Sequence, residues 1–511
     1  MIVIYHKGNK VSNVSIHGVF LTKLEAGNIA ACFYEMAREY PEDIIVWCHS
    51  DLQSDLNISI IPPLFNHPRK LFSYHISDEN FLGSRIGYVE ESVFIKINKS
   101  VRFPTWQMGS DVGAVSAAVL NACVDSINAD ENFDYFLVSL AKKAMPNGLL
   151  CYSEPALLTR KNVNNNTQEA GINTLFRFVK EHYKTRWIFL LFLNLLVYEK
   201  KWAFLPFLKA LTYKKCTFNS KKLHVILPNS LAIPENITID VVIPTIGRKK
   251  YLKDTLDDLA KQSICPVNVI IVEQNAETAS VSELDYITNE NWPFTIKHIF
   301  THQCGACNAR NLALNQITSE WVFFADDDIR MEPEFMQTAF QNIIDFGAEA
   351  VSVACCQKGE KPKHHTILQP VFFSSGCSLV RSEKLKGLEF SMGYEFGFGE
   401  DSDFGMQLRN IGCDVLYLPK PQILHLKAPV GGFRTQPQLA WKNEKYQPKP
   451  SPTLMLYFLR HYTIQQLNGY KTNLFIKYYK HQSIRNPLHY FNTFKKQWNV
   501  SVLWANQLAK K

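Results

Sequence analysis

The sequence predicts an α/β protein whose main domain is a doubly wound, mostly parallel sheet of Rossmann-like type. Three observations indicate this fold class. Strand-like and helix-like segments alternate between residues 239 and 325, as in parallel sheets. The strand-like segments are apolar nearly throughout, as expected of strands buried on both faces. Acidic residues follow one of these strands directly, at the edge where ligands bind in such sheets.

The elements follow in order from the spacing of apolar residues. They are a strand over 239–243, a helix over 252–262, a strand over 267–272, a helix over 308–317 and a strand over 321–325. The first strand is expected to stop at Pro244. Helices that follow buried strands in this way place the chemically unusual residues in the turns between them.

The chain of 511 residues is long enough for two or three domains. Its composition, 46% hydrophobic and 20% charged, is that of a globular protein with a sizeable core. We divide it into four regions. They are an N-terminal α/β domain (1–160), a helical and apolar linker region (161–235), a domain with the acidic motifs (236–444) and a basic, aromatic helical region (445–511).

The first acidic motif is Asp326-Asp327-Asp328, directly after the strand over 321–325. Three carboxylates at a buried strand end repel one another, and a divalent cation would relieve that repulsion. Oxygen ligands suit Mg²⁺ or Mn²⁺, and such an ion can bridge a diphosphate. A solvated turn or a helix cap explains the same residues equally well when they are taken alone.

The second motif is Gly399-Glu400-Asp401-Ser402-Asp403, which precedes a predicted helix over 404–410. The helix dipole keeps carboxylates at a helix N-terminus ionised. An ionised carboxylate beside a glycine-rich loop is a candidate general base for a hydroxyl nucleophile. Simple helix capping is the alternative interpretation.

Two further features follow along the chain. His425 comes after the short apolar strands over 415–418 and 423–425, where a histidine is usually a packing residue. With two acidic clusters upstream, it becomes a candidate third metal ligand. The segment Gly431-Gly-Phe-Arg434 is expected to be a loop whose arginine closes on phosphate.

The order of these motifs, from Asp240 to Arg434, resembles the family 2 glycosyltransferases, which have the GT-A fold. The matching segments are Val242-Ile-Pro-Thr245 with Arg248, Ile270-Ile-Val-Glu273, Gly305-Ala-Cys-Asn-Ala-Arg310-Asn311, Phe324-Ala-Asp326-Asp-Asp328, Gly399-Glu-Asp401-Ser-Asp403 and His425-Leu-Lys-Ala-Pro429. The fifth of these is similar to the motif of galactosyltransferase-like, inverting members. The chain departs from the family at Glu273, where aspartate is usual.

The resemblance implies a role for each candidate residue. Those implied to hold the nucleotide donor are Pro244, Thr245, Arg248, Glu273, Arg310, Asp326 and Asp327. Those implied to hold Mn²⁺ or Mg²⁺ are Asp326, Asp328 and His425. Asp401 is implied to be the catalytic base, and Glu400 to bind the acceptor. One in-line displacement would then invert the anomeric centre.

The implied reaction is metal-dependent transfer of a hexose or N-acetylhexosamine. The donor would be a nucleotide sugar, most simply a UDP-sugar, and the acceptor a glycan or lipid-linked glycan in the synthesis of cell-surface polysaccharide. Two other readings stay open. They are a non-catalytic carbohydrate-binding or scaffold protein on the same fold, and a nucleotidyltransferase, which would release pyrophosphate.

The N-terminal domain (1–160) contains a sequence pattern that also occurs in the domain with the acidic motifs (236–444). Residues 133–155 and 403–419 both run helix, glycine, short strand and proline, and Asp51 follows a strand-like segment. We therefore predict a degenerate GT-A-like copy. The interval from Tyr5 to Asp51 is too short to include the segment that would hold a nucleotide.

Net charge is distributed unevenly. Of the total of +8, residues 445–511 carry eleven Lys and Arg and no acidic residue. Basic plus aromatic composition suits either helices packed by their rings or peripheral contact with an anionic membrane. We predict no nucleic-acid partner. Scattered cysteines and the absence of a secretory signal predict a cytoplasmic protein. The membrane interpretation of residues 445–511 would place it at the inner face of the cytoplasmic membrane.

Overall fold

The structure is a computed structural model that describes residues 1–511 except 22–26, 78, 131, 161–168, 227–230 and 430–438. The chain forms two compact units, and each is built from two segments of the chain. Unit 1 comprises residues 1–229 and 462–482, and unit 2 comprises residues 230–461 and 483–511. The region predicted as one C-terminal piece, 445–511, is thus divided between the two units.

Unit 2 contains an eight-stranded sheet with the order β11-β10-β9-β12-β15-β14-β16-β13. Its strands are β9 (Ile239–Thr245), β10 (Asn268–Gln274), β11 (Thr295–Thr301), β12 (Trp321–Ala325), β13 (Ile329–Arg330), β14 (Ala350–Cys356), β15 (Cys377–Arg381) and β16 (Val415–His425). The strands from β11 to β12 are parallel, whereas β15 and β13 are antiparallel to their neighbours. The predicted mostly parallel α/β sheet is confirmed.

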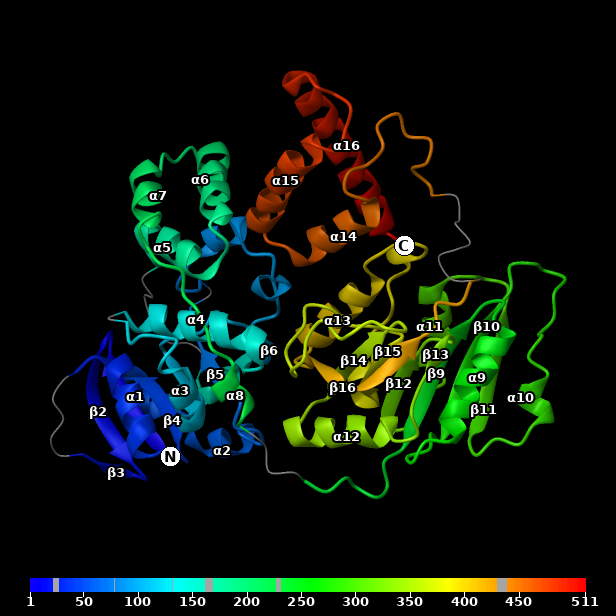
Figure 1. The fold of residues 1–511 in the computed structure, drawn as a ribbon, viewed down its shortest axis with the longest axis horizontal. Coiled ribbons are helices and arrows are strands. Elements are labelled where there is room, and N and C mark those ends of the chain that lie inside the picture. Colours follow the sequence, from blue (N-terminus) through cyan, green and yellow to red (C-terminus); the bar gives the residue numbers. More distant parts are fainter. Residues whose placement is uncertain (22–26, 78, 131, 161–168, 227–230, 430–438) are drawn as a thin grey trace. The chain divides into compact units, whose positions relative to one another are not determined.

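Helices connect these strands, and two more follow the last strand (Figure 1). They are α9 (Lys249–Ala260), α10 (Tyr286–Asn289), α11 (Ala306–Leu314), α12 (Phe335–Phe346), α13 (Glu400–Asn410), α14 (Pro452–His461) and α16 (Pro487–Leu508). Helix α9 buries Leu252, Leu256 and Leu259, which recur at helical spacing and face the core. Strands β10 and β12 are buried along their whole length, as their apolar sequences predict.

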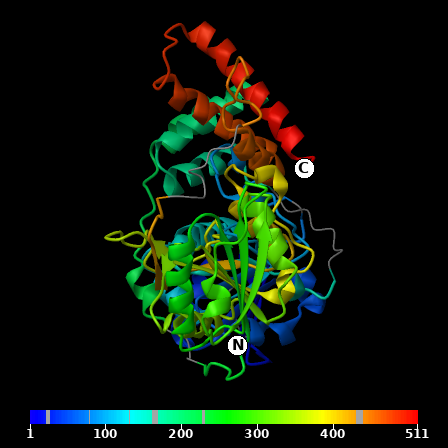
Figure 2. The same cartoon turned by 90° about the vertical axis from the view of Figure 1, so that its right-hand side faces the viewer.

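The C-terminal helices of unit 2 pack on one another. Helices α14 and α16 lie side by side in both views of the chain (Figures 1 and 2). The aromatic rings of Tyr457, Tyr490, Phe494 and Trp498 are buried in this pair. These four aromatic rings therefore serve packing.

Unit 1 contains a second eight-stranded sheet, with the order β3-β2-β1-β4-β7-β5-β8-β6. Its strands are β1 (Ile2–Lys7), β2 (Lys10–Ile16), β3 (Val19–Phe20), β4 (Ile44–His49), β5 (Lys70–Tyr74), β6 (Phe103–Pro104), β7 (Val112–Ser116) and β8 (Leu150–Ser153). Its helices are α1 (Ile29–Glu39), α2 (Ile61–Leu64), α3 (Ala117–Cys123), α4 (Phe133–Ala144), α5 (Ile172–His182), α6 (Arg186–Glu199), α7 (Phe204–Ala210), α8 (Lys221–His224) and α15 (Ile464–Tyr479).

The two sheets share the order of their central strands. The series β1-β4-β7-β5-β8 corresponds to β9-β12-β15-β14-β16, and each pair of neighbours runs in the same relative direction in both. The outer strands differ, because the antiparallel hairpin β2–β3 stands where parallel β10 and β11 stand in unit 2. This arrangement supports the predicted degenerate copy, which lacks the strands of the nucleotide segment.

Helix α15 completes unit 1. It packs against α6 and against the short helical turn at Ser84–Tyr88. A Cβ atom at Gly469 would lie 2.3 Å from the carbonyl oxygen of Tyr88, so the two backbones are in direct contact. The Gln466 side chain donates to the carbonyls of Glu90 and Ser92.

Among the residues that the structure describes, no helix combines the length and apolar character that crossing a bilayer requires.

Candidate active site

The candidate residues of unit 2 gather at the carboxyl ends of its parallel strands. Thr245 ends β9, Glu273 lies near the end of β10, and Asp326 follows β12. Because these three strands are neighbours and run in the same direction, the residues emerge at one edge of the sheet. Such an edge is the usual ligand site of open α/β sheets.

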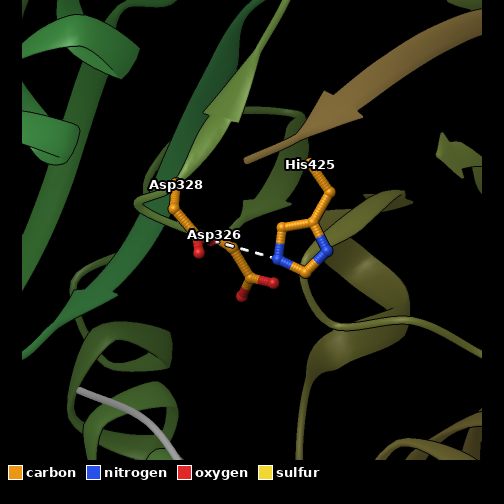
Figure 3. Close-up of side chains that lie close together, drawn as sticks. All are labelled: Asp326, Asp328 and His425. Atoms are coloured by element: carbon orange, nitrogen blue, oxygen red, sulfur yellow. Dashed lines mark ion pairs between the residues drawn. The ribbon is translucent and has the colours of Figure 1, made fainter. Parts of the chain in front are cut away.

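Asp326, Asp328 and His425 form a cluster at this edge. Their ligand atoms all lie within 4.8 Å of one another, and no other such group of three occurs among the described residues. Figure 3 shows the three side chains turned toward a common point, with His425 coming from the end of β16. Strand pairing of Ile329 with His425 fixes this approach.

The donor set fits a divalent metal ion. Two carboxylates and an imidazole are ligands that Mn²⁺ accepts, and carboxylates alone suit Mg²⁺. The Nε2 atom of His425 lies 3.3 Å from Asp328 Oδ1, and the backbone N–H of Ala428 donates to Asp328 Oδ2 at 2.8 Å. The side chain of Asp326 is 37% exposed.

Hydrogen bonds keep Asp328 ionised. Burial alone would raise the pKa of this carboxyl group, but the bonds from His425 and Ala428 and the charge of Arg248 hold the pKa below its ordinary value. The bond to Asp328 raises the pKa of His425 more than burial lowers it. Asp328 thus offers a charged ligand over the whole physiological range.

Asp327 lies behind this cluster. It accepts hydrogen bonds from Thr245 Oγ1 and Arg248 Nη1, each at 2.7 Å, and is almost fully buried. Burial raises the pKa of Asp327 to about 6 against the influence of Arg248. The three side chains tie the end of β9 to the turn after β12. Their contact with a nucleotide stays a prediction.

A pocket of about 710 Å³, including its open mouth, lies beside β9 and β10. Thr245, Arg248 and Glu273 are among its lining residues. Glu273 accepts from the backbone N–H of Glu283 at 3.1 Å and lies 3.0 Å from His298 Nε2. His298 lies on β11, and the sequence analysis had not singled it out. The pocket is suited in place and polarity to a nucleoside.

Arg310 connects the two acidic motifs. It projects from α11, and its Nη2 atom lies 3.6 Å from Asp326 Oδ1. Its guanidinium lies over the ring of Phe390, 5.5 Å from the ring centre. Burial raises the pKa values of Glu400 and Asp401, and the positive charge of Arg310 offsets part of that rise. Arg310 therefore acts on both motifs.

Glu400 and Asp401 are the first two residues of helix α13, which therefore begins before the predicted helix over 404–410 and includes most of the motif. The hydroxyl of Ser375 donates to Asp401 Oδ1. Burial raises the pKa of Asp401, and Arg310 and Ser375 only partly offset that rise. The pKa of Glu400 is raised by burial and by the neighbouring Asp401. The pKa values of both carboxyl groups are thus closer to neutral pH than they would be in water, as is typical of acid–base residues.

Gly376 lies directly against Asp326 of the metal cluster. A Cβ atom there would lie 2.2 Å from Asp326 Oδ2, so only glycine leaves room for that carboxylate. We expect Gly376→Ala to displace Asp326 and to lower transfer activity about 100-fold, since a small misplacement of a binding group has effects of that size. Metal titration of activity would measure the change.

The matched control is Gly171→Ala. Gly171 has an ordinary φ of −61°, and a Cβ atom there meets nothing within 4 Å. The control should keep wild-type activity. If Gly376→Ala also kept wild-type activity and metal affinity, the placement of Asp326 beside Gly376 would be wrong.

Asp403, the last acidic residue of the second motif, has a different environment. It accepts from Tyr394 Oη at 3.1 Å and Arg460 Nη1 at 3.2 Å, and His461 Nε2 lies 2.8 Å away. Burial would raise the pKa of Asp403, but these partners hold it below its ordinary value. Asp403 therefore joins α13 to α14. Sequence reasoning missed Ser375, Arg460 and His461, because no local pattern links them to the motif.

The equivalent edge of unit 1 has different residues. His49 is the last residue of β4 and Asp51 follows that strand, where Asp326 and Asp328 follow β12. The backbone N–H of Ser110 donates to Asp134 near the start of α4, in the place that Ser375 and Asp401 occupy in unit 2. Unit 1 thus retains the framework of the site without its metal cluster among the described residues.

The predicted loop Gly431-Gly-Phe-Arg434 lies outside the described residues.

An α/β domain with acidic side chains gathered at the carboxyl ends of its strands has the arrangement of an enzyme that binds its substrate at that edge. Residues 240–396 match the sequence model of Glycosyl transferase family 2. Unit 2 therefore contains a family 2 glycosyltransferase domain of the GT-A fold.

Two relatives are similar to part of the chain. Glycosyltransferase GlyA of Streptococcus pneumoniae is 26% identical over 117 residues, which are 22% of this chain and 16% of that protein. An uncharacterized glycosyltransferase of Haemophilus influenzae is 29% identical over 105 residues, 20% of this chain and 34% of that protein. The matched part thus spans about a third or less of these relatives.

Solved structures show weaker likeness. S. aureus TarS 1–349 in complex with UDP is 20% identical with a TM-score of 0.33, and the match covers 38% of this chain and 61% of that one. GalNAc-T7 with UDP, GalNAc and Mn²⁺ is 11% identical with a TM-score of 0.37, and the match covers 51% and 55%.

Proposed function

We propose that the protein is a metal-dependent, inverting glycosyltransferase. It moves a hexose or an N-acetylhexosamine from a UDP-sugar to a hydroxyl group of a glycan or lipid-linked glycan, in the synthesis of cell-surface polysaccharide. The observation that carries the proposal is the juxtaposition of two sites at one sheet edge. The cluster of Asp326, Asp328 and His425 is linked through Arg310 to the carboxylates of Glu400 and Asp401.

The residues have complementary tasks. The carboxylates of Asp326 and Asp328 and the imidazole of His425 would hold Mn²⁺ or Mg²⁺. A bound ion would neutralise the charge of the departing diphosphate. Thr245, Arg248 and Glu273 line the pocket proposed for the nucleotide. Pro244 and Asp327 are proposed to support the same site.

Asp401 is the proposed general base. It takes the proton of the acceptor hydroxyl while that oxygen bonds to the anomeric carbon and the bond to the diphosphate oxygen breaks. Attack from the side opposite the leaving group inverts the anomeric centre. Ser375 orients the carboxylate of Asp401, and Glu400 binds the acceptor. The positive charge of Arg310 limits the rise in the pKa of Asp401 that burial causes, and so favours the ionised carboxylate that a base requires.

We further propose a cytoplasmic protein that contacts an anionic membrane through residues 445–511. Support comes from the lysines and arginines of this segment and from large apolar side chains that stay exposed on α16, such as Leu488 and Phe491. A lipid-linked acceptor would then be close to the active site.

A donor screen tests the reaction. Purified protein is mixed with Mn²⁺ or Mg²⁺ and a panel of UDP-sugars, with and without glycan acceptors, and released UDP is measured. The proposal expects release that EDTA abolishes, from one donor more than the others. Release of pyrophosphate in place of UDP would contradict it, as would failure to bind any nucleotide in calorimetry.

On acidification, activity should fall at a pH above the pKa of an ordinary aspartate. Burial raises the pKa of Asp401, so its base form is lost on acidification at a pH above about 4, the value for a free aspartate. A pH profile of kcat/KM from pH 4 to 8 would measure this fall.

The loss of activity at low pH should not result from unfolding of the protein. Asp401 and Glu400 bind protons more tightly in the folded protein than in the unfolded chain, because both pKa values are raised. Their contribution to stability is therefore largest below the unfolded pKa and decreases as the pH rises through the folded one. Circular dichroism at each pH provides the check. Full activity down to pH 4 would contradict the assignment of Asp401.

A further inference from the structure

Helices α5, α6 and α7 form a small helical layer in unit 1, and they lie together in both views (Figures 1 and 2). Helix α6 is apolar on almost every side, since Asn194 is the only polar residue between Arg186 and Tyr198. One face of α6 is buried through Ile188, Leu191 and Leu195. Asn194 also lies on the buried side, where it accepts a hydrogen bond from Thr472 of α15.

The other face remains exposed and continues along α7. Leu205 is 78% exposed and Trp202 69%. We call this face the α6–α7 surface. Its exposed members are Phe189, Val197, Trp202, Phe204, Leu205, Leu208 and Leu211. Exposed apolar side chains so concentrated in one short segment mark an interaction site in a folded protein.

The side chains of the α6–α7 surface form one continuous patch. The ring of Phe192 lies 5.6 Å from that of Trp202 and 5.2 Å from that of Phe207. Phe189 contacts Phe207 at 5.0 Å, and Trp202 stacks on Phe204 at 5.9 Å. These ring contacts hold the exposed groups in place, so little order has to be gained when the surface meets a partner.

Positive charge surrounds this patch. The segment 184–215 contains seven exposed basic residues: Lys184, Arg186, Lys200, Lys201, Lys209, Lys214 and Lys215. Its only acidic residue is Glu199, which is paired with Arg85 at 2.8 Å and with Lys201 at 3.3 Å. An apolar, aromatic centre with a basic rim and no free carboxylate therefore faces solvent.

We propose that the α6–α7 surface docks the protein on a lipid bilayer that contains anionic phospholipids. Tryptophan and phenylalanine side chains enter the boundary between headgroups and acyl chains, where aromatic rings are enriched. Lysines on the rim neutralise lipid phosphates. The helices lie on the bilayer and do not cross it, in agreement with the lack of a spanning helix among the described residues.

A bilayer fits this surface better than a protein groove. A groove would accept one stripe of a helix, whereas here apolar residues project from α6, from α7 and from the connection between them. Net charge of +6 over residues 184–215 favours a surface of dispersed negative charge. This inference is independent of the reaction proposed above and concerns a different segment from residues 445–511.

Vesicle sedimentation tests the inference on the full-length protein. Two kinds of vesicle are compared. One contains phosphatidylcholine alone, and in the other about one lipid in three is the anionic phosphatidylglycerol. We expect binding to the anionic vesicles and a loss of about tenfold or more in Trp202→Ser/Leu205→Ser, because two apolar side chains lose their burial in the bilayer. We expect Lys200→Gln/Lys209→Gln to weaken binding by about fivefold per lysine.

The matched control is Val19→Ser/Phe20→Ser on β3, where the exposed fractions are 70% and 46%. It removes the same kind of side chain from the same unit, outside the α6–α7 surface and outside residues 445–511. The control should keep wild-type vesicle binding. All variants should also keep the wild-type unfolding temperature and UDP release with a soluble acceptor, because none of these residues lies at the active site.

Three results would overturn the proposal. The first is wild-type vesicle binding by Trp202→Ser/Leu205→Ser, which would leave residues 445–511 as the membrane contact. The second is equal binding to both kinds of vesicle. The third is a wild-type dimer in light scattering that this variant converts to a monomer, since the surface would then join two copies of the chain.

Discussion

Replacing Asp401 with asparagine should lower the rate of sugar transfer by about 10²–10⁴-fold, the usual contribution of a general base. Asparagine has the same shape as aspartate and can still accept a hydrogen bond from Ser375, so the start of α13 should be preserved. What is lost is the ability to take the proton of the acceptor hydroxyl. Release of UDP under saturating donor and acceptor would measure the loss.

Binding experiments separate this effect from damage to the donor site. Calorimetry should give the same UDP affinity for Asp401→Asn as for the wild type, because Asp401 lies away from the pocket beside β9 and β10. The neighbouring Ser402→Ala is the control and should transfer at the wild-type rate. Wild-type transfer by a folded Asp401→Asn variant would exclude this residue as the base.

The second large effect is expected at Asp328. Asp328→Asn keeps the volume of the side chain but removes one negative ligand from the cluster with Asp326 and His425. Loss of that ligand weakens metal binding, and a carboxylate that is buried and ionised contributes strongly to it. We expect at least about 100-fold lower activity at a metal concentration that saturates the wild type, since metal ions supply several kcal/mol of charge stabilisation.

Metal titration distinguishes a weakened site from a damaged one. The Mn²⁺ concentration for half-maximal activity should rise for Asp328→Asn, and calorimetry should show the same rise in the dissociation constant. Glu320→Gln is the control, because this glutamate belongs to the same unit and has a half-exposed side chain. Unchanged metal dependence in Asp328→Asn would show that the ion is held elsewhere.

Local patterns predicted the parts of unit 2 that depend on local physics. Alternating apolar segments gave the strands β9, β10 and β12, because a strand buried on both faces has a sequence unlike any other element. The acidic residues at 326–328 were placed correctly at a strand end for the same reason. The second motif was likewise followed by the predicted helix, although α13 begins at Glu400 and not at residue 404.

Long-range contacts were beyond such patterns. Asp403 is held by His461, which is 58 residues away in the sequence, and its lowered pKa depends on that contact. Ser375 meets Asp401 only because the loop before β15 returns to the start of α13. Hydrophobic periodicity carries no information on which distant segments meet, so these partners could not be predicted.

The C-terminal aromatic residues illustrate the same limit. Composition predicted that residues 445–511 are helical and basic, and three helices are found there. It could not tell that Trp498 packs within unit 2 while the middle helix, α15, packs on unit 1. The backbone contact between Gly469 and Tyr88 needs a glycine, but only the fold reveals its partner.

The division of these helices has a consequence for protein synthesis. The polypeptide passes from one unit to the other three times, after residues 229, 461 and 482. Unit 1 lacks α15, and with it the cover of Tyr88, until the ribosome has produced residue 479. Unit 2 lacks α16, whose last turn lies against Gly393, until residue 508 has emerged. Neither unit can therefore finish folding before the last helices of the chain have been made.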